Sequence, residues 1–126
     1  MTLSELRKGM VLLAHGARHP EWASPFQRMR QLLIAKQPDL LVELAFLSFM
    51  PPDLPTAIDR LAEQGADTVT VVPLFMGQSG HVLRDLPPMM EQARQTHQAL
   101  LLRLADAAGE DEDVLEALVM YCLGTL

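Results

Sequence analysis

The chain has 126 residues, which is room for one domain, and its 49% hydrophobic and 21% charged residues are the balance of a folded globular protein. Ten Lys and Arg against sixteen Asp and Glu give a formal net charge of −6. Without a basic cluster to neutralise phosphates, this charge argues against nucleic acid as a partner. We therefore expect a single domain over residues 1–126.

The first half of the chain alternates short apolar runs with a segment of helical period. Met10–Ala14 is a continuous apolar run that ends at His15-Gly16, which is typical of a strand buried on both faces. Trp22–Lys36 repeats apolar residues at steps of three and four, which indicates an amphipathic helix. Leu40–Leu47 is a second apolar run, and we interpret it as the second strand.

The next helix and strand have clear boundary signals. Asp53 stands where an N-cap residue is expected, after the break at Pro51-Pro52, and Gly65 stands where a glycine commonly follows a helix. The helical face between them contains Ile58, Leu61 and Ala62. The β-branched run Thr68–Val72 then predicts the third strand.

The last part of the chain predicts a loop, two helices and a fourth strand. The loop spans Gly77–Gly80, and a helix follows from about His81 to Gln95, with its start bent or shortened at Pro87-Pro88. Strands and helices continue to alternate, with a strand over Ala99–Leu104 and a helix over Asp111–Leu123.

Strands and helices thus alternate along the whole chain, which implies right-handed βαβ units. We predict an α/β fold of the flavodoxin-like type. It is a three-layer sandwich in which a four-stranded parallel sheet, in the order 2-1-3-4, has helices on both faces.

Cysteine content and the N-terminus bear on the compartment. Cys122 is the single cysteine, so neither an internal disulfide nor a paired-cysteine metal site is expected. The apolar run at Met10–Ala14 is far shorter than a signal peptide core or a membrane span. These features favour a cytoplasmic protein without a membrane partner.

Two histidines follow predicted strands. In an open parallel sheet, ligands bind outside the carboxyl ends of the strands, where the strand order reverses. His15 follows the first strand, and His81 follows the third strand through the glycine loop. Neighbouring strands lie about 4.8 Å apart and metal–nitrogen bonds are about 2.0–2.1 Å long, so two such imidazoles can hold one ion. A single histidine at a strand end more often bonds to a loop, but the pair together predicts a metal site.

Other residues carry weaker signals. His19 and His97 lack this placement, and we interpret both as surface histidines. Large apolar side chains gather at the ends of the second and third strands. They could line a pocket for a flat ligand or simply pack in the core, and both interpretations are open: Phe46, Phe49, Met50, Phe75 and Met76.

Three segments together resemble a known family. They are Leu12–Gly16, Val42–Leu47 and, most specifically, Val72–Gly77 with its continuation through Gly80-His81 to Asp85-Leu86-Pro87. Over most of its length the chain is similar to the small CbiX-type chelatases, which insert a divalent metal into sirohydrochlorin on the way to cobalamin or sirohaem. The resemblance implies a chelatase-like fold and a metal chelatase activity.

The resemblance also implies a site. It assigns the catalytic and metal-binding histidines to His15 and His81, the same two residues that their placement after strands singles out. The substrates are then sirohydrochlorin and a divalent ion, Co²⁺, Fe²⁺ or Ni²⁺, and no organic cofactor is needed. The residues expected to contact the macrocycle are Arg18, Arg84, Phe46, Phe75, Met76, Gly77, Ser79 and Gly80. Arg18 and Arg84 flank the histidines, and sirohydrochlorin, a polycarboxylate, needs such local positive charge on an acidic protein.

One departure from the family concerns proton transfer. Relatives usually have an acidic residue after the second strand, where this chain has Ser48. Removal of the pyrrole protons then falls to the histidines, to water or to a carboxylate such as Asp85. Imidazole accepts cobalt, iron and nickel alike, so the sequence leaves the metal open.

The resemblance further predicts a homodimer. Longer chelatases of the family have two similar halves with the active site in the cleft between them, and this chain supplies one half. Its last helix has an apolar arc wider than one packing face requires, formed by Val114, Leu115, Leu118, Val119, Tyr121, Cys122 and Leu123.

Two rival functions remain. Ala14–His19 is similar to the Arg-His-Gly motif of histidine phosphatases, but Ala14 occupies the arginine position, so a phosphohistidine lacks its electrostatic support. A carrier that binds metal or tetrapyrrole without turnover is the other alternative, and Ser48 keeps it open.

Overall fold

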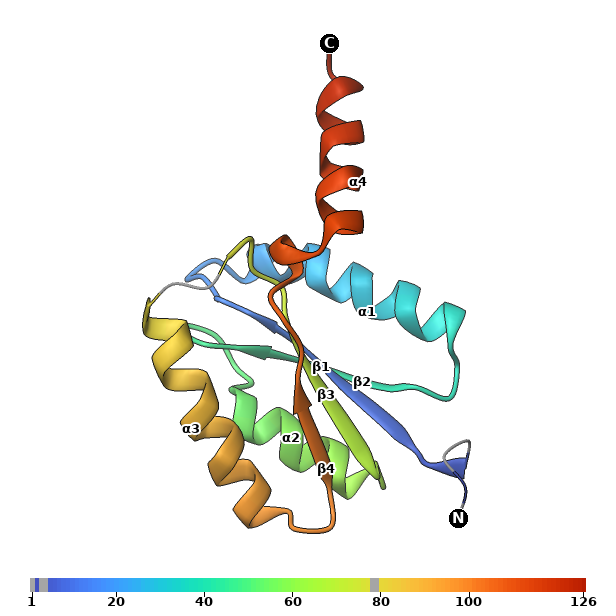
Figure 1. Cartoon of the computed structure of the whole chain (residues 1–126), viewed down its shortest axis with the longest axis vertical. Helices are drawn as coiled ribbons and strands as arrows, with labels where there is room; N and C mark the ends of the chain where they lie inside the picture. The colour runs from blue at the N-terminus through green and yellow to red at the C-terminus, as the bar shows by residue number, and fades with distance from the viewer. Residues whose placement is uncertain (1, 3–4, 78–79) are drawn as a thin grey trace.

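The computed structural model describes residue 2, residues 5–77 and residues 80–126. Its four strands form one parallel sheet in the order β2-β1-β3-β4 (Figure 1), which confirms the predicted fold class and strand order. The elements in chain order are β1 (Lys8–Ala14), η2 (Pro20–Ala23), α1 (Ser24–Lys36), β2 (Leu41–Phe46), α2 (Leu54–Glu63), β3 (Thr68–Pro73), α3 (Gly80–Thr96), β4 (Leu101–Leu104), η3 (Ala108–Glu110) and α4 (Glu112–Leu123).

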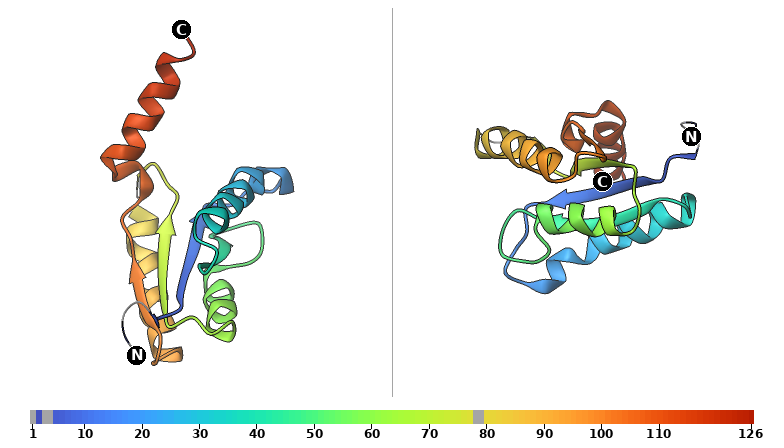
Figure 2. Two further views of the ribbon diagram at one scale, coloured as in Figure 1. Left: turned by 90° about the vertical axis from the view of Figure 1, so that its right-hand side faces the viewer. Right: turned by 90° about the horizontal axis from the view of Figure 1, so that it is seen from below.

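The sheet has helices on both faces, but one face carries a large hydrophobic core and the other only a small cluster. The main core lies between the sheet and helices α2 and α3, where Val11 and Leu13 of β1 pack with Leu61 of α2 and Leu86 of α3. Helix α1 and the turn η2 cover the opposite face, with a small cluster around Phe46. Figure 1 shows α1 on one side of the strands and α2 and α3 on the other, and the left view of Figure 2 shows α4 extending beyond the carboxyl ends of the strands.

Helix α3 differs from its predicted form. It runs without a break from Gly80 to Thr96 and contains Pro87 and Pro88 in its interior, so the two prolines do not shorten it. Leu86 and Met90, one on either side of the pair, are 1% exposed. Val82 and Ala93 of α3 are buried in the same core. Burial of this face against the sheet offsets the cost of the two interior prolines, because burying each large apolar side chain is worth about 1.5–3 kcal/mol.

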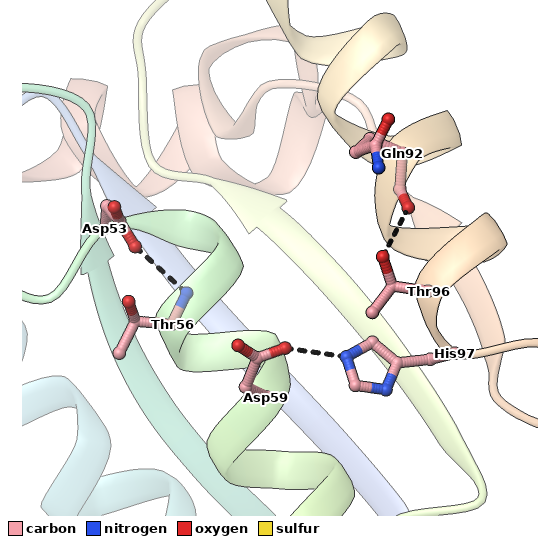
Figure 3. Close-up of polar contacts among 6 residues, drawn as sticks. All are labelled: Asp53, Thr56, Asp59, Gln92, Thr96 and His97. Atoms are coloured by element: carbon pink, nitrogen blue, oxygen red, sulfur yellow. Dashed lines mark hydrogen bonds and ion pairs between the residues drawn. The ribbon is translucent and has the colours of Figure 1, made fainter.

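The predicted cap of α2 is present. Oδ1 of Asp53 accepts a hydrogen bond from the backbone N–H of Thr56 at 2.9 Å (Figure 3). The side chain and the backbone N–H of Thr56 both favour the carboxylate and hold the pKa of Asp53 below its ordinary value of 3.8. At the other end of the helix, Gly65 has a φ of +92°, as the glycine signal predicted.

We expect the Asp53 cap to stabilise the fold at neutral pH and not in acid. Because the folded-state pKa is lowered, the unfolded chain takes up the proton first, so the contribution is complete above the unfolded pKa and disappears as the pH falls through the folded pKa. Asp53→Ala should cost about 1 kcal/mol at pH 7. Urea unfolding should show the difference in the free energy of unfolding between the wild type and Asp53→Ala disappearing below about pH 4. Asp53→Asn, which caps without titrating, is the control. A difference for Asp53→Ala that does not change with pH contradicts the assignment.

Helices α2 and α3 are joined by a polar contact. Nε2 of His97 lies 2.7 Å from Oδ1 of Asp59 (Figure 3), so this histidine, predicted to be a surface residue, links the two helices at the amino-terminal edge of the sheet. Thr96, the last residue of α3, donates its hydroxyl to the carbonyl of Gln92 at 3.1 Å. Among the helices that the structure describes, none has the length and apolar character needed to cross a membrane.

Candidate functional site

The carboxyl ends of β1, β2 and β3 meet at one edge of the sheet. β1 lies between β2 and β3, so the strand order reverses beside it, which is where an open α/β sheet binds its ligands. His15 is the first residue after β1. Hydrogen bonds continue past the strand, from Leu47 N–H to the Ala14 carbonyl and from Ser48 N–H to the His15 carbonyl, both at 3.0 Å. These bonds hold the His15 backbone against the loop after β2.

Gly16 allows the two loops to approach. Its φ is +95°, a conformation that other residues rarely adopt, and a Cβ atom here would lie 1.9 Å from the Ser48 carbonyl oxygen. No side chain fits in that space. Gly16 therefore sets the position of the preceding histidine through backbone geometry alone.

The His15 ring rests on a buried aromatic ring. Its centroid lies 4.2 Å from that of Phe75, and the two planes are inclined by 27°. Phe75 is 3% exposed and is held by the main core, whereas His15 is exposed. Within the described ranges, no residue hydrogen-bonds to the His15 ring. The imidazole is thus fixed by stacking, with its nitrogens open to a ligand.

The predicted partner of His15 is only partly described. His81 is the second residue of α3, and its side chain lies outside the described part of the structure, as does Ser79 of the preceding loop. Its backbone lies in the first turn of the helix, at the carboxyl edge of the sheet. The described residues contain no group of three or more His, Cys, Asp or Glu side chains suited to a metal ion. The pairing of His15 with His81 accordingly remains a prediction.

A pocket of about 410 Å³ lies beside the His15 loop. Arg18, Phe46 and Phe49 line it, together with Leu44, Met50 and Pro52. The Arg18 guanidinium carbon lies 4.7 Å from the centroid of the Phe49 ring, a cation–π contact. Phe49 itself has a φ of +71° and is 64% exposed, so the chain presents this large apolar ring to solvent in an unusual backbone conformation.

The other residues predicted to contact the substrate differ in their exposure to solvent. Met76 and Gly77 are exposed after β3, and Gly80 and Arg84 are exposed on the first turns of α3. Phe75 is different, because it is buried beneath His15 and offers its face to that ring instead of to a ligand. Sequence reasoning noted Phe49 only as a possible pocket wall and missed its contact with Arg18, since nothing in the sequence pairs residues from two different loops.

Comparison with protein families and with curated sequences gives one consistent result. The model of the CbiX family matches residues 9–121. The sirohydrochlorin cobaltochelatase of Saccharolobus solfataricus is 32% identical over 117 residues, which cover 88% of this chain and 90% of that protein. That of Sulfurisphaera tokodaii is 34% identical over 110 residues, 87% of each chain.

Solved structures agree in fold. The crystal structure of a CbiX protein of cobalamin biosynthesis from Marinobacter aquaeolei VT8 has a TM-score of 0.76 at 26% identity, covering 94% of this chain and 99% of that one. The sirohydrochlorin chelatase SirB of Bacillus subtilis subspecies spizizenii, in complex with cobalt, has a TM-score of 0.76 at 22% identity. It covers 89% of this chain but 48% of its own, so the likeness shows a shared fold with half of that protein.

Proposed function

The chain belongs to the CbiX family, and on that premise we propose that it is a sirohydrochlorin chelatase, an enzyme that inserts a divalent ion, cobalt or iron, into the macrocycle. The observation that carries the proposal is His15, held on Phe75 at the carboxyl edge of the sheet, with no hydrogen bond to its ring from the part of the chain that the structure describes. The curated relatives, which match nearly the whole chain, are sirohydrochlorin cobaltochelatases.

In the proposed reaction His15 and His81 hold the incoming ion, and water completes its coordination. The macrocycle docks at the carboxyl edge, and its nitrogens replace the waters and the imidazoles in turn. Two pyrrole N–H groups each lose a proton, so one divalent ion enters as two protons leave. Ser48 is exposed next to the site and cannot accept a proton as a carboxylate does. The proposed acceptors are therefore the imidazoles released from the ion, water, or Asp85 on the exposed side of α3.

Substrate carboxylates need a cation near the site, and we assign Arg18 to this role. Its side chain is exposed at the pocket, and its guanidinium lies over the Phe49 ring, which also lines the pocket. Phe49 acts through Arg18 and is a positioning residue. Arg84, which is exposed on the first turns of α3, is the second proposed cation.

Phe49→Leu is expected to weaken substrate binding with little effect on turnover. An exposed cation–π contact is worth about 0.5–1 kcal/mol, so KM for sirohydrochlorin should rise roughly two- to fivefold while kcat stays near the wild-type value. Phe49→Tyr, which keeps an aromatic face, should restore KM. In an Arg18→Gln background the Phe49→Leu change should add nothing, and an undiminished effect there would exclude the positioning role.

The choice of metal is tested by insertion rates. We propose cobalt or iron as the ion and the cobalamin or sirohaem route as the destination, in the cytoplasm. Initial rates with Co²⁺, Fe²⁺ and Ni²⁺ on the purified protein decide among the ions, since imidazole ligands alone do not. A nickel rate above both others would contradict the proposal.

A histidine-phosphatase-like reaction finds no support at the site. Ala14, at the position of the phosphate-binding arginine, is 1% exposed and is part of the sheet. The carrier alternative is favoured by one observation, the exposed Ser48 at the position where the family resemblance leads us to expect an acidic residue. It predicts stoichiometric binding of metal or macrocycle without an increased rate of insertion.

We also propose that the protein is a homodimer. The chain corresponds to one half of the longer two-halved chelatases that it resembles, and SirB is matched over 48% of its length. A second copy supplies the missing half. The proposal of a dimer does not depend on which exposed surfaces join the two copies.

A further inference from the structure

Helices α2 and α3 together frame a second pocket, with a volume of about 360 Å³. This volume is at the lower end of the range of about 300–1,000 Å³ that is typical of small-molecule sites, and it gives room for a molecule with one ring. At one end of the pocket the two helices are joined by the contact of His97 with Asp59 (Figure 3). The described residues that line this pocket are all different from those that line the pocket beside the His15 loop. We call it the α2–α3 pocket.

The floor and walls of the α2–α3 pocket are apolar. Ile58 of α2 and Ala93 of α3 form the floor, since both line the pocket and both are buried in the main core. The exposed rings of Pro55 and Pro88 and the half-buried side chain of Met89 form the walls. A proline ring has no rotamer freedom to lose when a ligand packs on it, so this surface is largely preorganised. Pro88, which removes a hydrogen bond from α3, thus contributes an apolar ring to the pocket.

The spacing of the lining residues sets the length of the pocket. On α2, Pro55 and Asp59 are four residues apart, and on α3 the same step separates Pro88, Gln92 and Thr96. Residues four apart lie on one side of a helix, so each helix presents a continuous stripe to the pocket. A step of four residues advances about 6 Å along the helix axis. The apolar wall at Pro55 and the carboxylate-bearing residue Asp59 are therefore about 6 Å apart along α2.

The other end of the pocket offers hydrogen-bond acceptors. Nε2 of His97 lies 2.7 Å from Oδ1 of Asp59, and because an ionised carboxylate only accepts, the imidazole N–H donates. The second carboxylate oxygen of Asp59 has no hydrogen-bond partner among the residues that the structure describes. The Asp59 side chain is 56% exposed, so that oxygen is accessible to a ligand. Thr96 donates its hydroxyl to the Gln92 carbonyl at 3.1 Å, which leaves the Thr96 oxygen as a second acceptor.

The charge of the α2–α3 pocket favours a cationic ligand. Among the described residues that line it, Asp59 is the only acid, and none is Lys or Arg. Arg94 of α3 is directed to β4 instead, where it donates to the Leu102 carbonyl at 3.2 Å, and it lies 3.6 Å from the Glu91 carboxylate. A primary ammonium group has three N–H donors and no acceptor. It therefore matches the free oxygen of Asp59 and the hydroxyl oxygen of Thr96.

We propose that the α2–α3 pocket binds a small arylalkylamine, whose aromatic ring packs on Pro55 and Pro88 and whose primary ammonium group pairs with Asp59. A two-carbon arm between ring and nitrogen spans the step of about 6 Å from Pro55 to Asp59. The ligand contacts both helices at once, so it stabilises the folded chain in which they are packed together. This site is separate from metal insertion and does not depend on the proposed chelatase reaction.

Titration of the ¹⁵N-labelled protein with 2-phenylethylamine tests the proposal. Amide signals of α2 and α3 should shift and saturate in the millimolar range, which a ligand of this size can reach. 2-Phenylethanol has the same ring and arm without the charge, and it should bind about two- to fivefold more weakly. High salt should reduce this difference. The proposal is overturned if the amine gives no saturable shift, if the shifts lie in other elements, or if amine and alcohol bind equally.

Asp59→Asn separates the ion pair from the packing of the helices. The amide oxygen of asparagine can still accept from His97, so the contact between the helices is kept, whereas the affinity for 2-phenylethylamine should fall to that for 2-phenylethanol. Glu63→Gln, one turn further along α2 and outside the pocket, removes the same charge and should bind the amine as the wild type does. Unchanged binding by Asp59→Asn, or equal weakening in both variants, contradicts the proposal. Neither metal nor sirohydrochlorin is present, so no outcome bears on the chelatase reaction.

Discussion

Replacing His15 or His81 with alanine is expected to lower kcat/KM for metal insertion by about 10²-fold or more. Two imidazoles that bind one ion act as a unit, so removing either of them should remove most of the affinity for the metal. His15 is exposed and rests on Phe75, which the core holds in place, so the fold should survive its loss. Insertion of cobalt and iron into sirohydrochlorin, followed by absorbance under limiting metal, measures the effect.

The double variant separates one shared site from two independent contributions. Residues of a single site give a double variant about as inactive as either single variant, whereas independent effects multiply. His97→Ala is the control, since His97 hydrogen-bonds to Asp59 far from the carboxyl edge of the sheet, and such a side-chain hydrogen bond is worth about 0.5–1.5 kcal/mol of stability. Near-wild-type insertion by His81→Ala would show that the metal site is wrongly assigned.

Gly16→Ala should be among the most destabilising single changes in the chain. The left-handed backbone costs a residue with a side chain about 1–2 kcal/mol, and the added Cβ also meets the Ser48 carbonyl, so the two loops must separate. Together with the steric term we expect a loss of roughly 2–5 kcal/mol in the free energy of unfolding. Urea denaturation monitored by circular dichroism measures it.

Gly65→Ala is the matched control for Gly16. Gly65 has a nearly equal φ of +92°, but a Cβ there would meet nothing closer than the end of the Arg7 side chain at 3.6 Å. It should cost only the backbone term of about 1–2 kcal/mol. Equal losses at the two glycines would mean that the close approach of Gly16 to Ser48 contributes nothing.

Local patterns were sufficient to predict the sheet and most element boundaries. Apolar runs bounded by turn residues specify buried parallel strands, and Asp53 and Gly65 have the positions that helix ends require. Pro87 and Pro88 were misleading, because proline propensity is local whereas the burial of Leu86 and Met90 depends on the assembled sheet.

The site was predictable in position and less so in its contacts. The placement of His15 follows from topology, since the residue after a central parallel strand lies at the binding edge. Its support by Phe75 and the contact of Arg18 with Phe49 join residues far apart in sequence, and only the fold brings them together. The isolation of α4 likewise depends on the linker geometry after β4, which composition does not encode.

The central claim is that this protein catalyses metal insertion, and turnover tests it most directly. Co²⁺ insertion into excess sirohydrochlorin should be followed by absorbance with catalytic amounts of the protein, alongside the spontaneous reaction and His15→Ala. We predict many turnovers per chain, a rate proportional to protein concentration, and loss of this rate in His15→Ala. Stoichiometric binding of metal or macrocycle at the spontaneous insertion rate would contradict the claim and identify the protein as a carrier.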